Sequence, residues 1–297
     1  MSKIAIIKIG ATGDVVRTSV LLHLYTHDEI TWITARHNIT VLPAQLTNLR
    51  HIVAIEDIVP SGILNEHFDL VISMDDDVTC ATVASSMNTS LLFGAFMRDG
   101  KVNYTVPSRE WFDMGLSSRW GKKRADELKW ENQSSYQEIL FRMLGHTFNG
   151  EEYMIPSDVI AKPRQRVIGI EARAGERWPT KKWDKFTQLA QRLTQDRYEC
   201  IFFEDRKDIK DYMLDIGSTS LVVSGDTLGM HIALALKIPV VAIFTCTSAV
   251  EIYGYERMEK IVSPCLNKAF YKTDFIPEAV KSISVDEVYN AIKKLLQ

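Results

Sequence analysis

The stretch of residues 221–244 constrains the fold of this chain more than any other. It reads LVVSGDTLGMHIALALKIPVVAIF. Residues 221–223 and 240–244 are runs of mainly branched apolar residues, which are typical of strands buried on both faces. Between them, apolar residues recur at helical spacing from Met230 until Pro239 ends the pattern. Two buried strands joined by a short helix form a βαβ unit, so a parallel α/β sheet is predicted.

The turn between the first of these strands and the helix is polar. Ser224-Gly225-Asp226-Thr227 combines turn-forming residues with residues that cap helices. The first N–H groups of a helix have no partners within it and carry partial positive charge, so such a turn can bind phosphate. A capped helix without a ligand would contain the same residue types, and the turn alone leaves both interpretations open.

Length and composition are those of an ordinary globular protein. The chain has 297 residues, of which 46% are hydrophobic and 25% charged, enough for one large or two medium domains. The net charge of -3 argues against a dedicated nucleic-acid binder. The cysteines lie far apart, with no C-x-x-C pair and no neighbouring histidines, which favours reduced thiols over disulfides or a zinc site; they are Cys80, Cys200, Cys246 and Cys265.

No segment is expected to span a membrane. The longest apolar stretch, residues 232–244, is interrupted by Lys237 and Pro239. Residues 1–9 contain an apolar run too short for a signal peptide and no small-residue cleavage site. These features predict a cytoplasmic protein.

The N-terminal part opens with another strand–turn–helix pattern. Residues 3–9 (KIAIIKI) are predicted to form a buried strand, which leads through a glycine-containing turn to a helix over residues 15–25. An NAD site is not expected, because a third glycine is missing at the fingerprint spacing and no acid ends the next strand at residues 30–34. Asp14 lies where α/β sheets bind ligands, and a carboxylate at a helix N-terminus stays ionised. Alternatively, Asp14 only caps its helix.

Adjacent carboxylates follow the strand predicted at residues 69–74. Asp75-Asp76-Asp77 offers the oxygen ligands that hard cations prefer. Such a run more often forms a solvated loop or the acidic start of a helix. No metal site is therefore predicted here.

Residues 99–135 show no regular periodicity and mix tryptophans with basic side chains. Such a segment could bind an anionic lipid-linked glycan or a membrane surface, or it could be a loop that packs its own tryptophans. The residues concerned are Trp111, Arg119, Trp120, Lys122, Lys123, Arg124 and Trp130.

Two prolines and a polar mix at residues 156–165 predict a linker. It would join an N-terminal domain of residues 1–155 to a C-terminal domain of residues 166–297. In the second domain, strands are predicted at 166–170 and 198–203 and helices at 183–193 and 208–216, and Ser284 is expected to cap the last helix.

Three elements of the chain resemble, in order, those of glycosyltransferase family 9, the ADP-heptose:lipopolysaccharide heptosyltransferases. The first is Gly13-Asp14-Val15-Val16-Arg17-Thr18, and the second is the glycine-containing turn that ends in Arg177-Trp178-Pro179-Thr180-Lys181-Lys182-Trp183. The third is Asp226-Thr227-Leu228-Gly229-Met230-His231 followed by Pro239-Val240-Val241-Ala242-Ile243-Phe244.

The sequence differs from the family motifs at several positions. Leu228 stands where the family usually has glycine, and Gly229 follows one place late. Glu176 stands where many relatives have lysine. Between Phe203 and Leu221 there is room for one helix, where relatives usually fit a helix, a strand and another helix.

The resemblance implies an α/β fold with two Rossmann-like domains facing across a cleft, the GT-B arrangement, with a shortened C-terminal domain. It implies inverting transfer of a heptose, or a similar sugar, from an ADP-activated donor to a sugar hydroxyl of lipopolysaccharide or another surface glycan. No metal or other cofactor is expected, because arginine and lysine supply positive charge for the leaving group.

By the same resemblance, Asp14 is the general base that takes the proton of the acceptor hydroxyl. Arg177, helped by Arg173 or Lys181, neutralises the diphosphate, and Glu204 binds the ribose. The complete set of donor-binding residues implied is Thr12, Gly13, Arg173, Arg177, Lys181, Glu204, Asp226, Thr227, Leu228, Gly229 and His231.

The expected partners are a nucleotide-sugar donor and a lipid-linked or surface glycan, with no nucleic acid. Peripheral contact with the inner face of the cytoplasmic membrane stays open. Two alternatives also stay open. One is a non-catalytic nucleotide-sugar-binding or scaffold descendant of the family. The other is a nucleotide-sugar epimerase of the same architecture, which would need more acids and histidines than these motifs supply.

Overall fold

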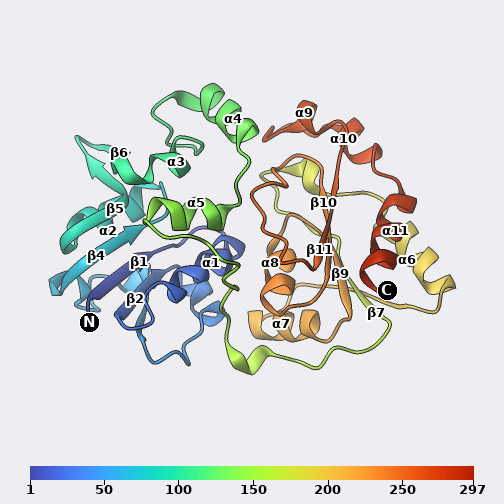
Figure 1. Cartoon of the computed structure of the whole chain (residues 1–297), viewed down its shortest axis with the longest axis horizontal. Coiled ribbons are helices and arrows are strands. Elements are labelled where there is room, and N and C mark those ends of the chain that lie inside the picture. The colour runs from blue at the N-terminus through green and yellow to red at the C-terminus, as the bar shows by residue number, and fades with distance from the viewer. The chain divides into compact units, whose positions relative to one another are not determined.

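The computed structural model describes all 297 residues, which divide into two compact units, Met1–Ser157 and Asp158–Gln297 (Figure 1). Each unit is an α/β structure built on one sheet.

The first unit contains a six-stranded sheet in the order β3-β2-β1-β4-β5-β6. Its strands are β1 (Lys3–Ile7), β2 (Glu29–Thr34), β3 (Leu49–Ala54), β4 (His67–Ser73), β5 (Asn88–Arg98) and β6 (Lys101–Tyr104). Only the pairing of β5 with β6 is antiparallel. Because β2 and β3 build outward on one side of β1 and β4 lies on the other, the strand order reverses between β1 and β4, where α/β sheets bind their ligands.

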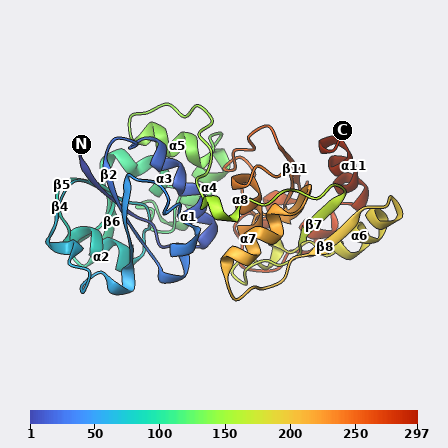
Figure 2. The same ribbon diagram turned by 90° about the horizontal axis from the view of Figure 1, so that it is seen from below.

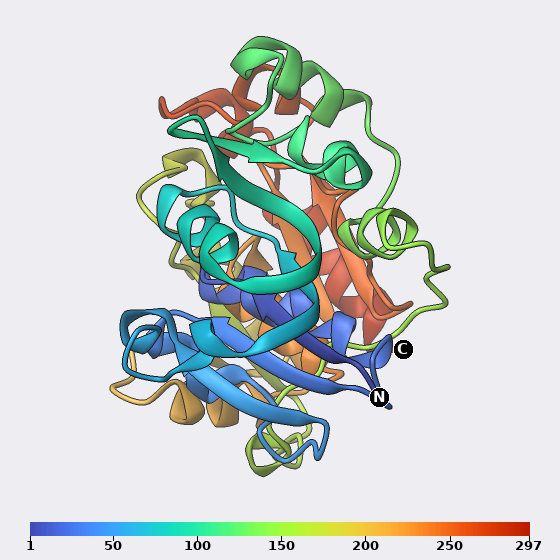
Figure 3. The ribbon, with the colours of Figure 1, turned by 90° about the vertical axis from the view of Figure 1, so that its left-hand side faces the viewer.

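Helices cover both faces of this sheet, as Figure 2 shows for α2 and α5. The α-helices are α1 (Thr12–Thr18), α2 (Val78–Ser86), α3 (Arg109–Phe112), α4 (Gly121–Glu131) and α5 (Tyr136–Met143). Short 3-10 helices are η1 (Ser19–His23), η2 (Arg36–Val41), η3 (Ile55–Asp57), η4 (Ile63–Asn65), η5 (Val106–Ser108) and, across the boundary between the units, η6 (Ser157–Val159). Buried side chains of β1, such as Ala5 and Ile7, pack with Cys80 and Val83 of α2. Figure 3 looks onto this unit and shows the twist of its strands.

The second unit contains a five-stranded, fully parallel sheet in the order β11-β10-β9-β7-β8. Its strands are β7 (Val167–Glu171), β8 (Glu199–Phe202), β9 (Leu221–Gly225), β10 (Val240–Phe244) and β11 (Met258–Val262). The order is of the flavodoxin type and reverses between β7 and β9. The carboxyl ends of β7 and β9 are therefore the expected place for a ligand.

Figure 1 shows α6 and α11 on one side of this sheet and α7 and α8 on the other. The elements are η7 (Pro179–Lys181), α6 (Phe186–Gln195), α7 (Ile209–Gly217), α8 (Leu228–Ala235), α9 (Leu266–Ala269), α10 (Pro277–Lys281) and α11 (Val285–Leu295). Trp183 and Ile292 lie in the core that α6 and α11 form with the sheet. The βαβ unit predicted at residues 221–244 is confirmed, and every residue of β9 and β10 is buried.

Two predictions about local structure were wrong. The helix expected over residues 15–25 is α-helical only to Thr18 and continues as η1. The hydroxyl groups of Thr18 and Ser19 donate to the carbonyls of Asp14 and Val16, at 2.6 Å each, and such bonds compete with regular helix bonds.

The segment of residues 99–135, expected to be irregular, contains α3 and α4. Ion pairs at helical spacing support α4, including the Arg124–Glu127 pair at 3.1 Å. None of the helices in the chain combines the length and apolar character that a membrane span requires.

Candidate functional site

One group of predicted site residues lies in the first unit, where β1 and β4 end, at the reversal of the strand order. Asp14 stands in the first turn of α1, and its side chain is 34% exposed. The N-cap of α1 is Ala11, without any side-chain cap bond, so Asp14 does not serve as the cap. Its carboxylate forms an ion pair with Arg17 at 2.9 Å, which leaves part of the carboxylate open to solvent.

Aromatic rings hold the Arg17 side chain. The guanidinium carbon lies 4.2 Å from the centre of the Tyr136 ring and 5.4 Å from that of Trp111. The Tyr136 hydroxyl lies 2.8 Å from the hydroxyl of Thr18, one helical turn after Asp14. Arg17 is thus fixed between Asp14 and a buried aromatic residue, and it restricts the orientations available to the Asp14 carboxylate.

Lys8 follows β1 directly and is another cation of this region. Its side chain is 8% exposed and forms an ion pair with Asp75, whose side chain is 12% exposed. Burial alone would lower the pKa of Lys8, but the negative charges of Asp75 and Asp14 outweigh burial and raise that pKa above its usual value. Lys8 therefore stays charged, with carboxylates around it.

The three adjacent aspartates considered as a metal site have separate partners. Asp75 binds Lys8, whereas Asp76 accepts the backbone N–H of Ser117 at 3.0 Å. Asp77 caps α2 by accepting the backbone N–H groups of Thr79 and Cys80. Each of the three carboxylates therefore stabilises a different part of the local structure, and Asp77 does so as the N-cap of a helix.

Thr12 and Gly13 lie at the start of α1. The Thr12 hydroxyl donates to the Asn38 side chain at 2.6 Å, and the amide of Asn38 donates to the carbonyls of Ile9 and Gly10. Gly13 is buried inside α1. In the structure these residues shape the turn that carries Asp14.

A second group of predicted site residues lies in the second unit, at the N-terminus of α8, directly after β9. Its N-cap residue is Thr227, but no side-chain cap bond is formed. The Thr227 hydroxyl instead lies 2.9 Å from that of Ser224. No side chain therefore caps the N–H groups of the first turn, which leaves them for an anion.

A largely buried ion pair fixes the turn before α8. Lys181 Nζ lies 2.9 Å from a carboxylate oxygen of Asp226 and donates to the Asp226 carbonyl at 2.8 Å, and His231 Nε2 lies 3.9 Å from the same carboxylate. Burial alone would raise the pKa of Asp226, but the charge of Lys181, followed by that of His231, outweighs it and holds that pKa well below its usual value. Asp226 is therefore ionised at neutral pH and matches the charge of Lys181.

Arg173 is also paired with carboxylates. Its backbone N–H and its guanidinium bind the buried carboxylate of Glu171 at 2.6–2.9 Å, and the guanidinium also contacts Asp205. Of the predicted cations Arg173, Arg177 and Lys181, only Arg177 has no carboxylate partner. It is exposed, and its guanidinium carbon lies 5.1 Å from the centre of the Trp178 ring.

Packing explains the glycine that the sequence places one position late. A Cβ atom on Gly229 would lie 2.6 Å from the Tyr212 hydroxyl and 3.2 Å from Cγ of Glu171. The Tyr212 hydroxyl donates to Glu171, so this buried pair lies against the first turn of α8. Glu204, proposed for the ribose, is exposed just after β8, and Leu228 is half-buried at the start of α8.

Sequence reasoning missed Lys8, Asp75, Glu171 and Tyr212 as members of these networks. Glu171 carried a signal, since a charged residue at the carboxyl end of a buried central strand needs a partner. Tyr212 carried none, because only the fold brings α7 against β7.

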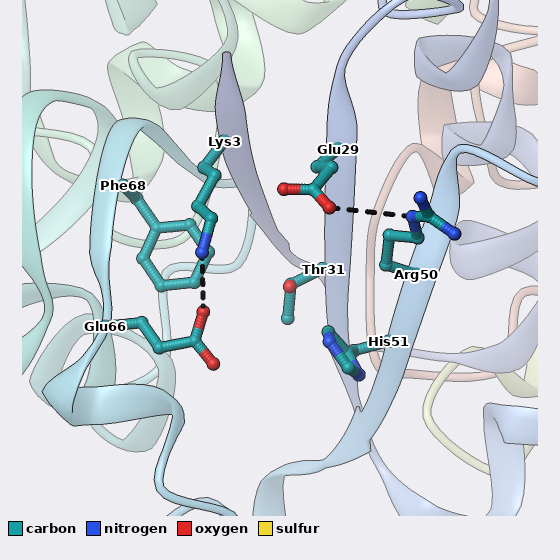
Figure 4. Close-up of a pocket in the computed structure, with 7 residues that line it drawn as sticks. All are labelled: Lys3, Glu29, Thr31, Arg50, His51, Glu66 and Phe68. Carbon is teal, nitrogen blue, oxygen red and sulfur yellow. Dashed lines mark hydrogen bonds and ion pairs between the residues drawn. The ribbon is translucent and has the colours of Figure 1, made fainter. Parts of the chain in front are cut away.

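A separate pocket lies at the opposite edge of the first sheet, near the amino ends of its strands (Figure 4). Its charged side chains pair with one another, Lys3 with Glu66 at 3.3 Å and Arg50 with Glu29 at 3.5 Å. Asp14 follows the carboxyl end of β1, so this pocket is not part of the candidate site.

Comparison with known proteins gives the same family as the motifs. The family model described as glycosyltransferase family 9 (heptosyltransferase) matches residues 206–275, which include the turn and helix around Asp226. No curated protein matches the sequence.

Solved structures of the family have the same fold. The glycosyltransferase family 9 protein of Veillonella parvula is 16% identical, with a TM-score of 0.67 over 99% of this chain and 97% of its own. ADP-heptose lps heptosyltransferase II of E. coli is 12% identical, with a TM-score of 0.64 over 99% and 98%. E. coli heptosyltransferase WaaC, solved with ADP, is 14% identical, with a TM-score of 0.60 over 98% and 97%.

These similarities confirm the predicted fold class, an α/β protein with two Rossmann-like domains of the GT-B type. The family match and the heptosyltransferase structures support a glycosyltransferase. The resemblance to glycosyltransferase family 9 is therefore confirmed, in sequence over residues 206–275 and in fold over nearly the whole chain.

Proposed function

We propose that this protein is an inverting glycosyltransferase that moves a heptose, or a similar sugar, from an ADP-activated donor to a sugar hydroxyl of lipopolysaccharide or another surface glycan. The observation that carries the proposal is the N-terminus of α8, which has no side-chain cap and lies in the same unit as Arg177, a cation without a carboxylate partner. Such a combination suits a diphosphate.

In the donor half of the proposal, N–H groups of the α8 first turn bind one phosphate and Arg177 binds the diphosphate through its planar guanidinium. The ion pair of Lys181 with Asp226 holds the turn in place and contributes no net charge of its own. Glu204 is proposed to accept a ribose hydroxyl. The adenine-containing donor is supported by relatives with this fold, since WaaC has been solved with ADP and with ADP-2-deoxy-2-fluoro heptose.

In the acceptor half, Asp14 takes the proton of the attacking hydroxyl. The acceptor oxygen forms a bond to the anomeric carbon while the bond from that carbon to the diphosphate oxygen breaks, so the configuration inverts. Negative charge develops on the departing ADP, and Arg177 and the α8 N–H groups stabilise it. We assign acceptor binding to residues 1–155 and donor binding to residues 166–297, joined by residues 156–165.

We propose that exposed apolar side chains of residues 106–130 contact the acceptor glycan or the inner face of the cytoplasmic membrane. Val106, Leu116, Trp120 and Trp130 are each at least half exposed. Basic side chains of this segment are largely paired, for example Arg119 with Asp113 at 3.0 Å. Apolar and aromatic contact therefore contributes more than charge in this proposal.

Sugar transfer is expected to survive EDTA. Asp75, Asp76 and Asp77 bind different protein groups, and Arg177 offers positive charge for the leaving group. Initial rates measured with and without excess EDTA, after the protein has been dialysed against the chelator, should agree within error. A strict requirement for added Mg²⁺ or Mn²⁺ would contradict this mechanism.

Nucleoside diphosphates are expected to raise the melting temperature, ADP more than UDP or dTDP. A ligand at about one hundred times its dissociation constant adds roughly 2.7 kcal/mol to the free energy of unfolding, which a thermal shift detects. Arg177→Ala should weaken the binding of every diphosphate alike, because the guanidinium recognises charge and not the base. Isothermal titration calorimetry of the wild type and the variant measures this loss.

Lys162→Ala is a suitable control for Arg177→Ala. Lys162 is exposed and precedes β7 at the amino end of the strand, away from the carboxyl ends where the ligand is proposed to lie. Its removal should leave the affinity for ADP unchanged. If no nucleoside diphosphate shifts the melting temperature at millimolar concentration, the transferase proposal fails and a non-catalytic scaffold replaces it.

A further inference from the structure

Asp75 lies at the carboxyl end of β4, and the proposed reaction gives it no role. One of its carboxylate oxygens contacts Lys8 Nζ, and the other accepts the backbone N–H groups of Ile9 and Gly10, the latter at 2.9 Å. All of these donors belong to the segment that follows β1. The largely buried carboxylate therefore binds this whole segment at one point.

The same segment leads directly into α1, whose first turn carries Asp14. It is tightly packed, since a Cβ atom on Gly10 would lie 2.8 Å from an Asp75 oxygen and 2.9 Å from Lys8 Nζ. Neither the lysine side chain nor the backbone can shift without breaking bonds to Asp75. The path of the chain between β1 and Asp14 is thus fixed from β4, the strand on the other side of the strand-order reversal.

We propose that Asp75 is a positioning residue for the transfer reaction: it holds the Lys8 ammonium and the Ile9–Gly10 backbone, and through them it sets the place of the Asp14 carboxylate. Asp75 takes up no proton and touches no substrate. The inference rests on the proposed function, in which Asp14 is the base. A misplacement of a catalytic group by about 1 Å can cost on the order of a hundredfold in rate, so such support matters.

Neighbouring aspartates provide matched controls. Asp76 accepts a single backbone N–H, from Ser117, and Asp77 caps α2. Neither forms a hydrogen bond or an ion pair with the segment from Lys8 to Asp14. Asp76→Asn and Asp77→Asn therefore make the same chemical change one and two positions away, and asparagine caps a helix about as well as aspartate does.

Asp75→Asn leaves the buried Lys8 without its counter-ion and can destabilise the fold, so a second variant is needed. The double variant Asp75→Asn/Lys8→Gln removes both charges together, and removal of a complete buried pair is much less costly than removal of one partner. If the ion pair only stabilises the fold, the double variant should regain activity together with stability. If the pair positions Asp14, stability should recover while the rate stays low.

The test is steady-state kinetics with an ADP-sugar donor and its glycan acceptor, with melting temperatures measured in parallel. Asp75→Asn should lower kcat by at least about tenfold. The KM for the donor should stay unchanged, because the donor is proposed to bind the second unit. Asp76→Asn and Asp77→Asn should stay within about twofold of the wild type, and the double variant should be stable but slow.

Two results would overturn the inference while the proposed function stands: wild-type kcat in Asp75→Asn, or recovery of kcat in the double variant. Failure of the proposed function has a different outcome. In that case the wild-type protein itself transfers no sugar from any nucleotide donor, and the positioning role of Asp75 is then contradicted together with the proposed function.

Discussion

Replacement of Asp14 by asparagine is expected to slow sugar transfer by about 10²–10⁴-fold, the usual contribution of a general base. Asparagine has nearly the shape of aspartate but cannot take the proton of the acceptor hydroxyl. The fold should tolerate the change. Ala11 and not Asp14 is the N-cap of α1, and the Asp14 side chain is 34% exposed, so loss of its ion pair with Arg17 should cost on the order of 1 kcal/mol.

The rate of nucleotide release measures this effect, and the affinity for ADP measured by calorimetry should stay at the wild-type value. Asp57→Asn is a matched control, because Asp57 also forms an ion pair with an arginine, Arg36 at 2.7 Å, and has no role in the proposed reaction. It should react at the wild-type rate. An Asp14→Asn variant that transfers sugar as fast as Asp57→Asn would show that Asp14 is not the base.

Replacement of Asp226 by asparagine is expected to cause the largest loss of stability, up to about 3–5 kcal/mol, the cost of breaking a fully buried ion pair. The Lys181 side chain is 18% exposed and would lose its counter-ion, while His231 would lose a neighbouring negative charge. Urea unfolding at neutral pH measures the change. Asp226→Asn/Lys181→Met should recover part of the loss, and equal stability of the wild type and the single variant would contradict the proposed ion pair.

Acid should remove the contribution of this ion pair. The pKa of Asp226 is lower in the folded protein than in the unfolded chain, so below the ordinary aspartate value of about 3.9 the unfolded chain binds the proton more readily. The stabilisation is complete well above that value and is lost as the pH falls from it towards the folded-state pKa. Unfolding of the wild type and of Asp226→Asn should therefore differ less as the pH drops below about 4.

Much of the fold follows from local patterns in the sequence. The branched apolar runs at 221–223 and 240–244 became β9 and β10, because strands buried on both faces have few alternatives. Ser284 caps α11 through a capping box with Glu287, as its position before an apolar-periodic stretch predicted. Asp208 likewise caps α7, the single helix expected between β8 and β9.

Two features of the helices, the presence of α4 and the early end of α1, are not apparent from the apolar pattern of the sequence. In α4, ion pairs such as Arg124–Glu127 stabilise a helix with few buried residues, and such a helix has no clear apolar period. The early end of α1 is linked to the hydroxyl groups of Thr18 and Ser19, which donate to backbone carbonyls, and such bonds cannot be read from an apolar pattern.

The sequence predicts the motifs that contain the candidate site residues, but not the ion pairs that these residues form. The pairing of Lys181 with Asp226 joins residues 45 positions apart, and that of Lys8 with Asp75 joins residues 67 positions apart. Such pairs depend on which strands become neighbours in the sheet, and single-sequence patterns do not contain that information. The resemblance predicts that Lys181 helps to neutralise the diphosphate, and the structure places the largely buried carboxylate of Asp226 beside it.

The most direct test of the proposed function is nucleotide release from a panel of nucleotide sugars by the purified protein, with an acceptor glycan present and with Asp14→Asn run in parallel. The wild type should release ADP from ADP-heptose or a related ADP-sugar faster than it releases UDP or dTDP from their sugars. Asp14→Asn should release ADP about 10²–10⁴-fold more slowly than the wild type. If the folded wild-type protein releases no nucleotide from any donor, or releases it as fast as the Asp14→Asn variant does, the account is contradicted.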